Sequence, residues 1–237
     1  MSRISVVLSL LGRGREALVR EVRDVVVVPW RGLRSRGPLG VSLALCAVLA
    51  VTGLHAFQQT AVGADVLRVV SEVRADQPLW LTLLRTPVSL FVPAVDLSVW
   101  GGLPRLFLAF ALAELLFGRA RTLVVAYAVT LAGTLGARVM IALGPDRLGL
   151  PGSAAHAVDT GASAAIVGLF AWTAVVLRAP VLFVVAVIPT VMGSFADPGL
   201  AGREHLVAVV VAALLGVVPY REWAVRRVVA PSVVSGR

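Results

Sequence analysis

Runs of apolar residues, separated by short polar or charged stretches, fill most of this chain. A helix needs roughly 20 apolar residues to cross a hydrocarbon core about 30 Å thick, and six runs approach or reach that length. They cover residues 39–57, 101–117, 122–143, 157–177, 181–196 and 205–220. The pattern therefore predicts an all-α polytopic membrane protein, a bundle of six transmembrane helices.

Two shorter apolar stretches lie between the first two predicted spans. Residues 66–73 carry valines at helical spacing beside charged residues, and residues 79–92 are apolar but interrupted by Arg85 and Pro87. Neither stretch is long enough to cross a bilayer. We expect both to lie in the membrane interface.

Residues 1–38 form an arginine-rich segment ahead of the first predicted span. Within it, apolar residues recur at helical spacing: Leu18, Val22, Val25 and Val26. One interpretation is a helix on an anionic membrane surface, and the other is a loosely ordered basic tail. In the first, three arginines reach the lipid headgroups: Arg15, Arg20 and Arg23.

The composition agrees with a membrane protein. Hydrophobic residues make up 58% of the chain and the mean hydropathy is +0.91, whereas about half of a soluble domain is apolar. The net charge of +9 comes from arginine alone, and the arginines gather at the chain ends and in short connections. This distribution predicts that both termini are cytoplasmic and gives no indication of nucleic-acid binding.

Few residues could hold a metal ion or a disulfide. Cys46 is the only cysteine, so no intrachain disulfide can form, and three scattered histidines do not predict a metal site. We expect no metal and no cofactor.

Ser163 stands among small residues at the start of the fourth predicted span. Small neighbours let another helix approach closely, and a hydroxyl at this place is open to a group on that helix. The alternative is a plain packing face, with the hydroxyl bonded back to its own helix. The choice depends on whether a base stands nearby.

A base could come from one of three histidines, His55, His156 and His205. With a cytoplasmic N-terminus, the fourth and sixth spans both run inward, so Ser163 and His205 both lie near the outer membrane surface. Ala208 and Ala212 would let the sixth helix come close. We expect a dyad of Ser163 and His205, in preference to the alternative of His156, Asp159 and Ser163.

Four charged residues fall inside predicted spans, Arg105, Glu114, Arg138 and Asp159, and two of them bear on the fold. Glu114 is an ionisable residue within the membrane, which by default suggests function, but Arg119 or Arg121 is near enough to pair with it. Arg138 is close enough to the end of the third span to reach the interface. Gly133 and Gly136 on that span suit close helix packing.

Three of these motifs resemble the rhomboid family of intramembrane serine proteases, and most closely its actinobacterial rhomboid-like branch. Gly161-Ala162-Ser163-Ala164 and residues 165–168 resemble the family's Gly-x-Ser-Gly-x-x-x-Gly run, and His205 with its alanines resembles the sixth-helix histidine. The third motif, at the turn from the second to the third helix, comprises Glu114, Gly118, Arg121 and Tyr127.

The resemblance implies a rhomboid-like domain at residues 39–220, between cytoplasmic segments 1–38 and 221–237. It implies a protease of the bacterial inner membrane that cleaves transmembrane segments of client proteins within the lipid bilayer. Ser163 would be the nucleophile and His205 the base. The oxyanion and substrate would be held at Gly161, Ala162 and Ser98.

The chain departs from the family at several of these places. The second helix usually brings a histidine and an asparagine towards the oxyanion, whereas Ser98 and Gly102 stand there in this chain. Ala164 replaces a glycine, and Val167 an aromatic residue. A second interpretation therefore stays open, a pseudoprotease that binds client helices without cutting them. A small transporter is a third, although no inverted repeat is visible.

Overall fold

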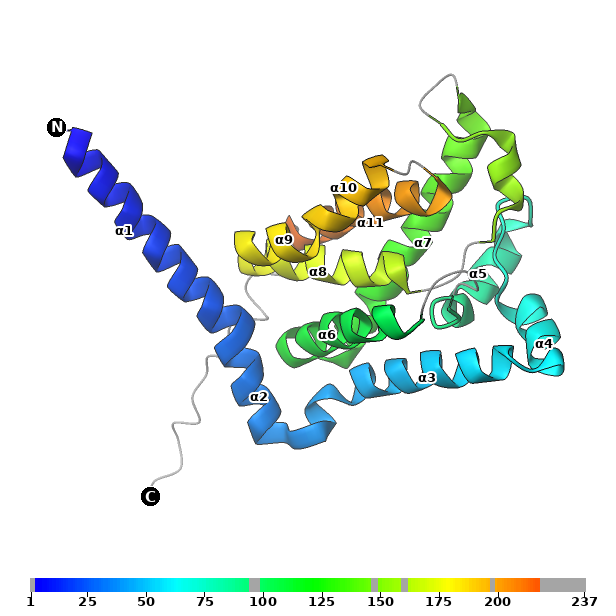
Figure 1. Ribbon diagram of the computed structural model, residues 1–237, viewed down its shortest axis with the longest axis horizontal. Coiled ribbons are helices and arrows are strands. Elements are labelled where there is room, and N and C mark those ends of the chain that lie inside the picture. Colours follow the sequence, from blue (N-terminus) through cyan, green and yellow to red (C-terminus); the bar gives the residue numbers. More distant parts are fainter. Residues whose placement is uncertain (1–2, 94–98, 146–148, 159–161, 197–198, 218–237) are drawn as a thin grey trace.

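The computed structural model describes the chain except for residues 1–2, 94–98, 146–148, 159–161, 197–198 and 218–237 (Figure 1). Every element within the described residues is a helix. Four stretches there are long and apolar enough to cross a membrane: Gly14–Gln58, Val99–Phe117, Arg119–Leu143 and Leu200–Val217. The chain is therefore an all-helical protein suited to a lipid bilayer.

The helices follow one another in this order. The α-helices are α1 Arg3–Val22, α2 Val28–Arg36, α3 Ser42–Gln58, α4 Ala61–Ser71, α5 Leu79–Ser89, α6 Val99–Phe117, α7 Arg119–Leu143, α8 Ser163–Leu177, α9 Pro180–Ala186, α10 Ile188–Ala196 and α11 Leu200–Val217. A π-helix, η1 (Arg23–Val27), joins α1 to α2, and the 3-10 helices are η2 Gly37–Val41 and η4 Gly152–His156.

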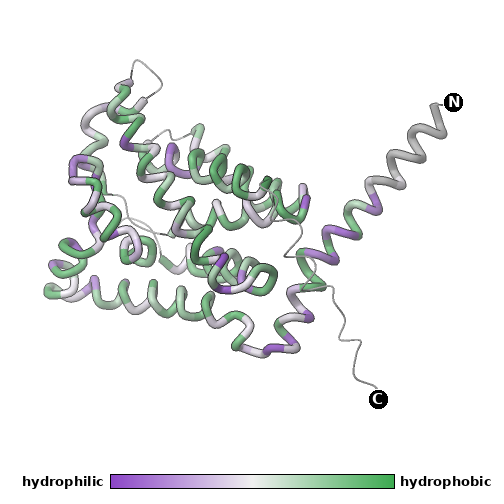
Figure 2. The backbone as a smooth tube through the Cα atoms, turned by 180° about the vertical axis from the view of Figure 1, so that it is seen from behind, coloured by the Kyte–Doolittle hydropathy of each residue, from purple (hydrophilic) through white to green (hydrophobic). Residues whose placement is uncertain are grey.

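The bundle has two distinct ends (Figure 1). We call α1, η1 and α2 the arm, and the end of the bundle beside it the arm end. The opposite end, the loop end, carries α4, α5 and η4. Hydrophobic residues cover the bundle helices, whereas hydrophilic residues recur along the arm (Figure 2). The arm is helical in the structure, as the first of the two interpretations of residues 1–38 expects.

The first three predicted spans agree with α3, α6 and α7 to within a few residues. The other three differ. The fourth predicted span, residues 157–177, corresponds to α8, which begins only at Ser163. The residues before it differ, because residues 152–156 form η4 and Ala157 after them is extended. The fifth is divided into α9 and α10 at Val187, two residues before Pro189, whose ring and missing N–H disturb a helix. The sixth begins at Leu200, so that His205 lies in its second turn.

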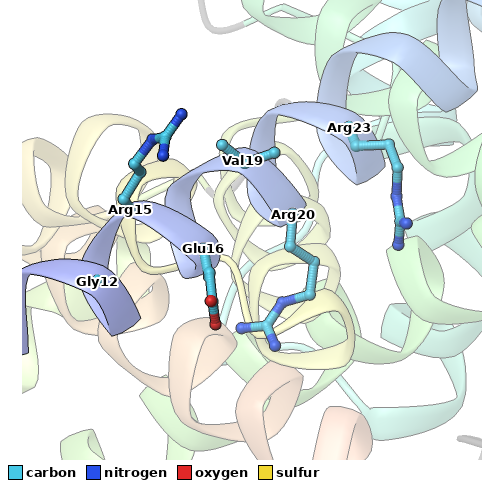
Figure 3. A pocket seen from close by; sticks show the side chains of 6 residues that line it. All are labelled: Gly12, Arg15, Glu16, Val19, Arg20 and Arg23. Atoms are coloured by element: carbon cyan, nitrogen blue, oxygen red, sulfur yellow. The ribbon is translucent and has the colours of Figure 1, made fainter. Parts of the chain in front are cut away.

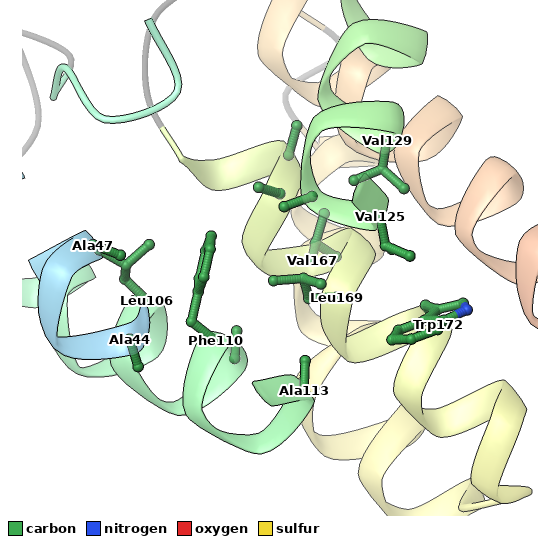
Figure 4. Packing of buried hydrophobic residues seen from close by; sticks show 14 of the residues in the cluster. Ala44, Ala47, Leu106, Phe110, Ala113, Val125, Val129, Val167, Leu169 and Trp172 are labelled. Atoms are coloured by element: carbon green, nitrogen blue, oxygen red, sulfur yellow. The ribbon is translucent and has the colours of Figure 1, made fainter. Parts of the chain in front are cut away.

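Glycines allow α7, α8 and α11 to pack closely. A Cβ atom on Gly136 of α7 would lie 2.9 Å from a methyl group of Val207 on α11, and one on Gly168 of α8 would lie 2.5 Å from a methyl group of Val129 on α7. The predicted close packing of the third span is confirmed at Gly136. Figure 4 shows Val129 in the core with residues of α3, α6 and α8, among them Ala44, Phe110 and Trp172.

Replacing Gly168 by alanine is expected to destabilise the protein by about 1–3 kcal/mol, because the added methyl group overlaps Val129, a side chain with little rotamer freedom. Gly53→Ala on α3 is the matched control, since a Cβ there meets nothing within 4 Å. The control should be neutral or stabilising by up to about 1 kcal/mol. Equal free energies of unfolding for the two variants, measured in detergent micelles, would refute the close contact.

Glu114 joins α6 to the beginning of α3. Its carboxylate is 2% exposed and accepts hydrogen bonds from the backbone N–H groups of Leu43 and Ala44, both at 3.1 Å, and from the Ser42 hydroxyl at 3.2 Å. Arg119 Nε donates to Oε1 at 3.0 Å. The predicted pairing with Arg119 is confirmed. The carboxylate also occupies the positive end of the α3 helix dipole, which gives Glu114 a structural role.

Candidate functional site

Ser163 is the first residue of α8 and its side chain is exposed. Ala162 before it is the N-cap, and its carbonyl oxygen accepts from the N–H of Ile166 at 2.8 Å. A methyl side chain cannot cap the first-turn N–H groups of α8, and no side-chain cap is present among the described residues. The N-terminus of a helix can bind an acceptor through such groups.

His205 lies in the second turn of α11 and is partly buried. Its neighbour Glu204 is 6% exposed and lies against α7, where a Cβ on Gly133 would be 3.3 Å from the Glu204 carbonyl oxygen. Glu204 was not among the predicted site residues. The signal that could have indicated it is a carboxylate directly before the candidate base, at the start of an apolar run.

α8 and α11 pack side by side and both run from the loop end to the arm end (Figure 1). Near the arm end, a Cβ on Gly216 of α11 would lie 2.8 Å from a methyl group of Val175 and 3.5 Å from the carbonyl oxygen of Trp172, both on α8. Counting back equally along both helices from these two contacts places Ser163 level with residues 204–207, a range that includes His205. Ser163 and His205 thus come to the same end of the pair at similar depth.

The small residues between these two helices are buried as expected. Ala165 of α8 and Ala208 and Ala212 of α11 are each 0% exposed and belong to one hydrophobic core. Two further predicted site residues, Gly161 and Ser98, lie outside the described residues. Gly102 is described and is exposed in the first turn of α6.

His156, the alternative base, has a partner in the loop between α4 and α5. Its Nδ1 lies 3.2 Å from Oδ2 of Asp76, and the N–H of Asp76 donates to the Ala155 carbonyl at 3.4 Å. Asp159, the third member of the alternative triad, lies outside the described residues. Sequence spacing could not indicate the contact with Asp76, because the two side chains are 80 residues apart.

Arg138, which we expect to be close enough to the helix end to reach the interface, holds the same loop. Its guanidinium donates to the carbonyl oxygens of Gln77 at 2.8 Å and Arg74 at 2.7 Å, and to the Thr82 hydroxyl. Hydrogen bonds from a charged donor are strong, so Arg138 fixes the α4–α5 connection on α7.

Two further contacts hold the loop in place. Arg85 donates to the Glu72 carbonyl at 2.9 Å, and the Tyr127 hydroxyl donates to the Leu83 carbonyl at 3.3 Å. The Glu72 carboxylate also accepts a hydrogen bond from Arg74 and raises the pKa of that guanidinium. The loop is therefore a fixed part of the end at which α8 and α11 begin.

No protein-family model, curated protein or solved structure matches this chain. The site is therefore interpreted from its own residues. Within the described residues, no three histidine, cysteine or acidic side chains lie together in a way that could hold a metal ion. The chemistry that these residues offer is that of a hydroxyl, an imidazole and a helix N-terminus.

Proposed function

We propose that this chain is a rhomboid-like intramembrane serine protease in which Ser163 and His205 form the catalytic dyad. In this proposal α3, α6, α7, α8, the pair α9–α10, and α11 are the six spans. The shorter helices cross with local thinning of the bilayer. Following the arginines, the arm end faces the cytoplasm of a bacterial cell and the loop end faces outward.

One observation supports the proposal: α8 and α11 pack side by side and run in the same direction, with Ser163 at the start of α8 and His205 in the second turn of α11. A serine hydroxyl is a weak nucleophile until a base accepts its proton, and a neutral imidazole is the usual base near pH 7. The loop that Arg138 fixes lies at this same end, where it would limit the access of water and of substrate.

The reaction would proceed in two steps. Ser163 Oγ attacks the carbonyl carbon of a peptide bond in a client's transmembrane segment, while His205 accepts the hydroxyl proton and returns it to the leaving amine. Water then attacks the acyl-serine ester while His205 accepts a proton from that water, and His205 passes this proton to Ser163 Oγ as the acid is released. The uncapped N–H groups at the start of α8 would stabilise the oxyanion.

The alternative is a pseudoprotease that binds client helices without cutting them. Gly102 favours it, because an exposed glycine stands where the family places a side-chain donor to the oxyanion. Loss of one such donor lowers rates by about 100- to 1000-fold in other enzymes. The presence of both a serine and a histidine at the matching positions favours the protease.

A fluorophosphonate probe distinguishes the two, because an activated serine displaces its fluoride and keeps the phosphonyl group. We expect the wild type to be labelled, Ser163→Ala to take no label, and the control Ser35→Ala, which removes an exposed hydroxyl on α2, to be labelled normally. Absence of label on folded wild-type protein would exclude the dyad and leave the client-binding function.

A further inference from the structure

The arm presents an apolar stripe away from its contacts with the bundle. Leu18, Val22, Val26 and Trp30 follow one another at four-residue intervals and are 50%, 48%, 58% and 52% exposed. A strict four-residue repeat drifts around an α-helix of about 3.6 residues per turn. The wider turn of the π-helix η1 offsets that drift, so the stripe continues from α1 into α2.

The arm is also rich in arginine. Residues 12–36 contain seven arginines and only three acidic residues. Arg15, Arg20 and Arg23 line a shallow hollow of about 480 Å³ on α1, together with Gly12, Glu16 and Val19. Figure 3 shows the Arg15 guanidinium on one side of α1 and the Arg20 and Arg23 guanidiniums on the other. On α2, the Arg34 guanidinium lies 4.9 Å from the Trp30 ring centre.

Two contacts fix the depth of the arm. Glu21 is 6% exposed, and its Oε1 accepts from the N–H of Leu182, in the first turn of α9, at 2.7 Å. On α2, a Cβ at Gly32 would lie 3.6 Å from a methyl group of Leu115, near the end of α6. α6 ends and α9 begins at the arm end, and both are apolar helices. The arm therefore lies where the bilayer ends and its headgroups begin.

We propose that the arm binds the anionic phospholipid surface of the bilayer that contains the bundle. The stripe enters the boundary between acyl chains and headgroups, with Trp30 at the depth that tryptophan prefers. The arginine side chains extend to the lipid phosphates. Glu21 keeps the arm joined to α9 in this position. A second copy of the chain is a poor occupant, because its arm carries the same excess of positive charge.

The test uses the full chain in nanodiscs with a fluorescent reporter on the stripe. Val22→Cys in a Cys46→Ala background carries an environment-sensitive dye, read by a lipid-borne quencher and by aqueous iodide. In phosphatidylglycerol-containing discs we expect quenching from the lipid and protection from iodide, both weakened by salt. In phosphatidylcholine alone, protection should be largely lost.

Substitution of Arg15, Arg20 and Arg23 by glutamine should weaken association of the arm with the headgroups on the order of 100-fold. The matched control replaces Arg68 and Arg105, exposed arginines outside the arm, and should behave as the wild type. The salt titration uses the labelled protein with all its arginines in place, so a folding defect of the triple variant cannot mimic the result.

Three outcomes would overturn the proposal. The first is equal protection in neutral and anionic discs or in the triple variant. The second is protection of the dye by inorganic phosphate in neutral discs, which would indicate a site for free phosphate. The third is protection that persists in detergent without lipid, which would indicate a protein occupant.

Discussion

Glu114→Ala is expected to destabilise the protein by about 2–5 kcal/mol, because each buried donor left without an acceptor costs about 1–3 kcal/mol. The substitution deprives the N–H groups of Leu43 and Ala44 and the Arg119 guanidinium of their shared acceptor. It also removes the negative charge at the positive end of α3. Free energies of unfolding in detergent micelles measure the effect.

The control for Glu114 is Asp65→Ala, which removes a carboxylate from an exposed pair with Arg68. Such pairs contribute about 0–1 kcal/mol, so the control should remain close to the wild type. Glu114→Gln should fall between the two, because the amide oxygen can still accept one hydrogen bond. If Glu114→Ala were as stable as the control, the carboxylate would not hold α3 to α6.

His205→Ala is expected to slow fluorophosphonate labelling of Ser163 by about 100- to 10,000-fold, the range over which general-base catalysis acts. The same loss should appear in cleavage of a transmembrane client. His156→Ala is the matched control, because that imidazole is already paired with Asp76 and should leave the rate unchanged. A rate that falls with His156→Ala and not with His205→Ala would assign the base to His156.

The sequence predicted those elements whose signal is local. The long apolar runs of α3, α6 and α7 predicted their helices to within a few residues, and Glu114 with Arg119 is a short-range pair that spacing alone could suggest. The division of the fifth predicted span into α9 and α10 was not predicted, although Pro189 inside the run is a local signal for it.

Contacts between distant segments could not be read from the chain. Arg138 binds backbone carbonyl groups 61 and 64 residues away, which every residue possesses and no pattern marks. Glu21 meets the N–H of Leu182 across 161 residues. The start of α8 at Ser163 was also missed, because the small residues that precede it favour neither a helix nor a loop strongly.

The candidate site was likewise predicted from the sequence only in part. Ser163 and His205 were chosen as residue types, and their shared end of the bundle follows from two parallel helices that the apolar runs predicted. Their depth depends on the register of α8 against α11. That register is set by close contacts such as Gly216 against Trp172, which only the packed structure shows.

Cysteine cross-linking tests the central claim, that Ser163 faces His205, most directly. Cysteines replace Ser163 and His205 in a Cys46→Ala background, and in a second protein they replace Ser163 and His156. A disulfide requires Cα atoms about 4.4–6.8 Å apart. We predict that mild oxidation joins positions 163 and 205 and leaves 163 and 156 separate. A bond between 163 and 156, with none between 163 and 205, would contradict the proposed site.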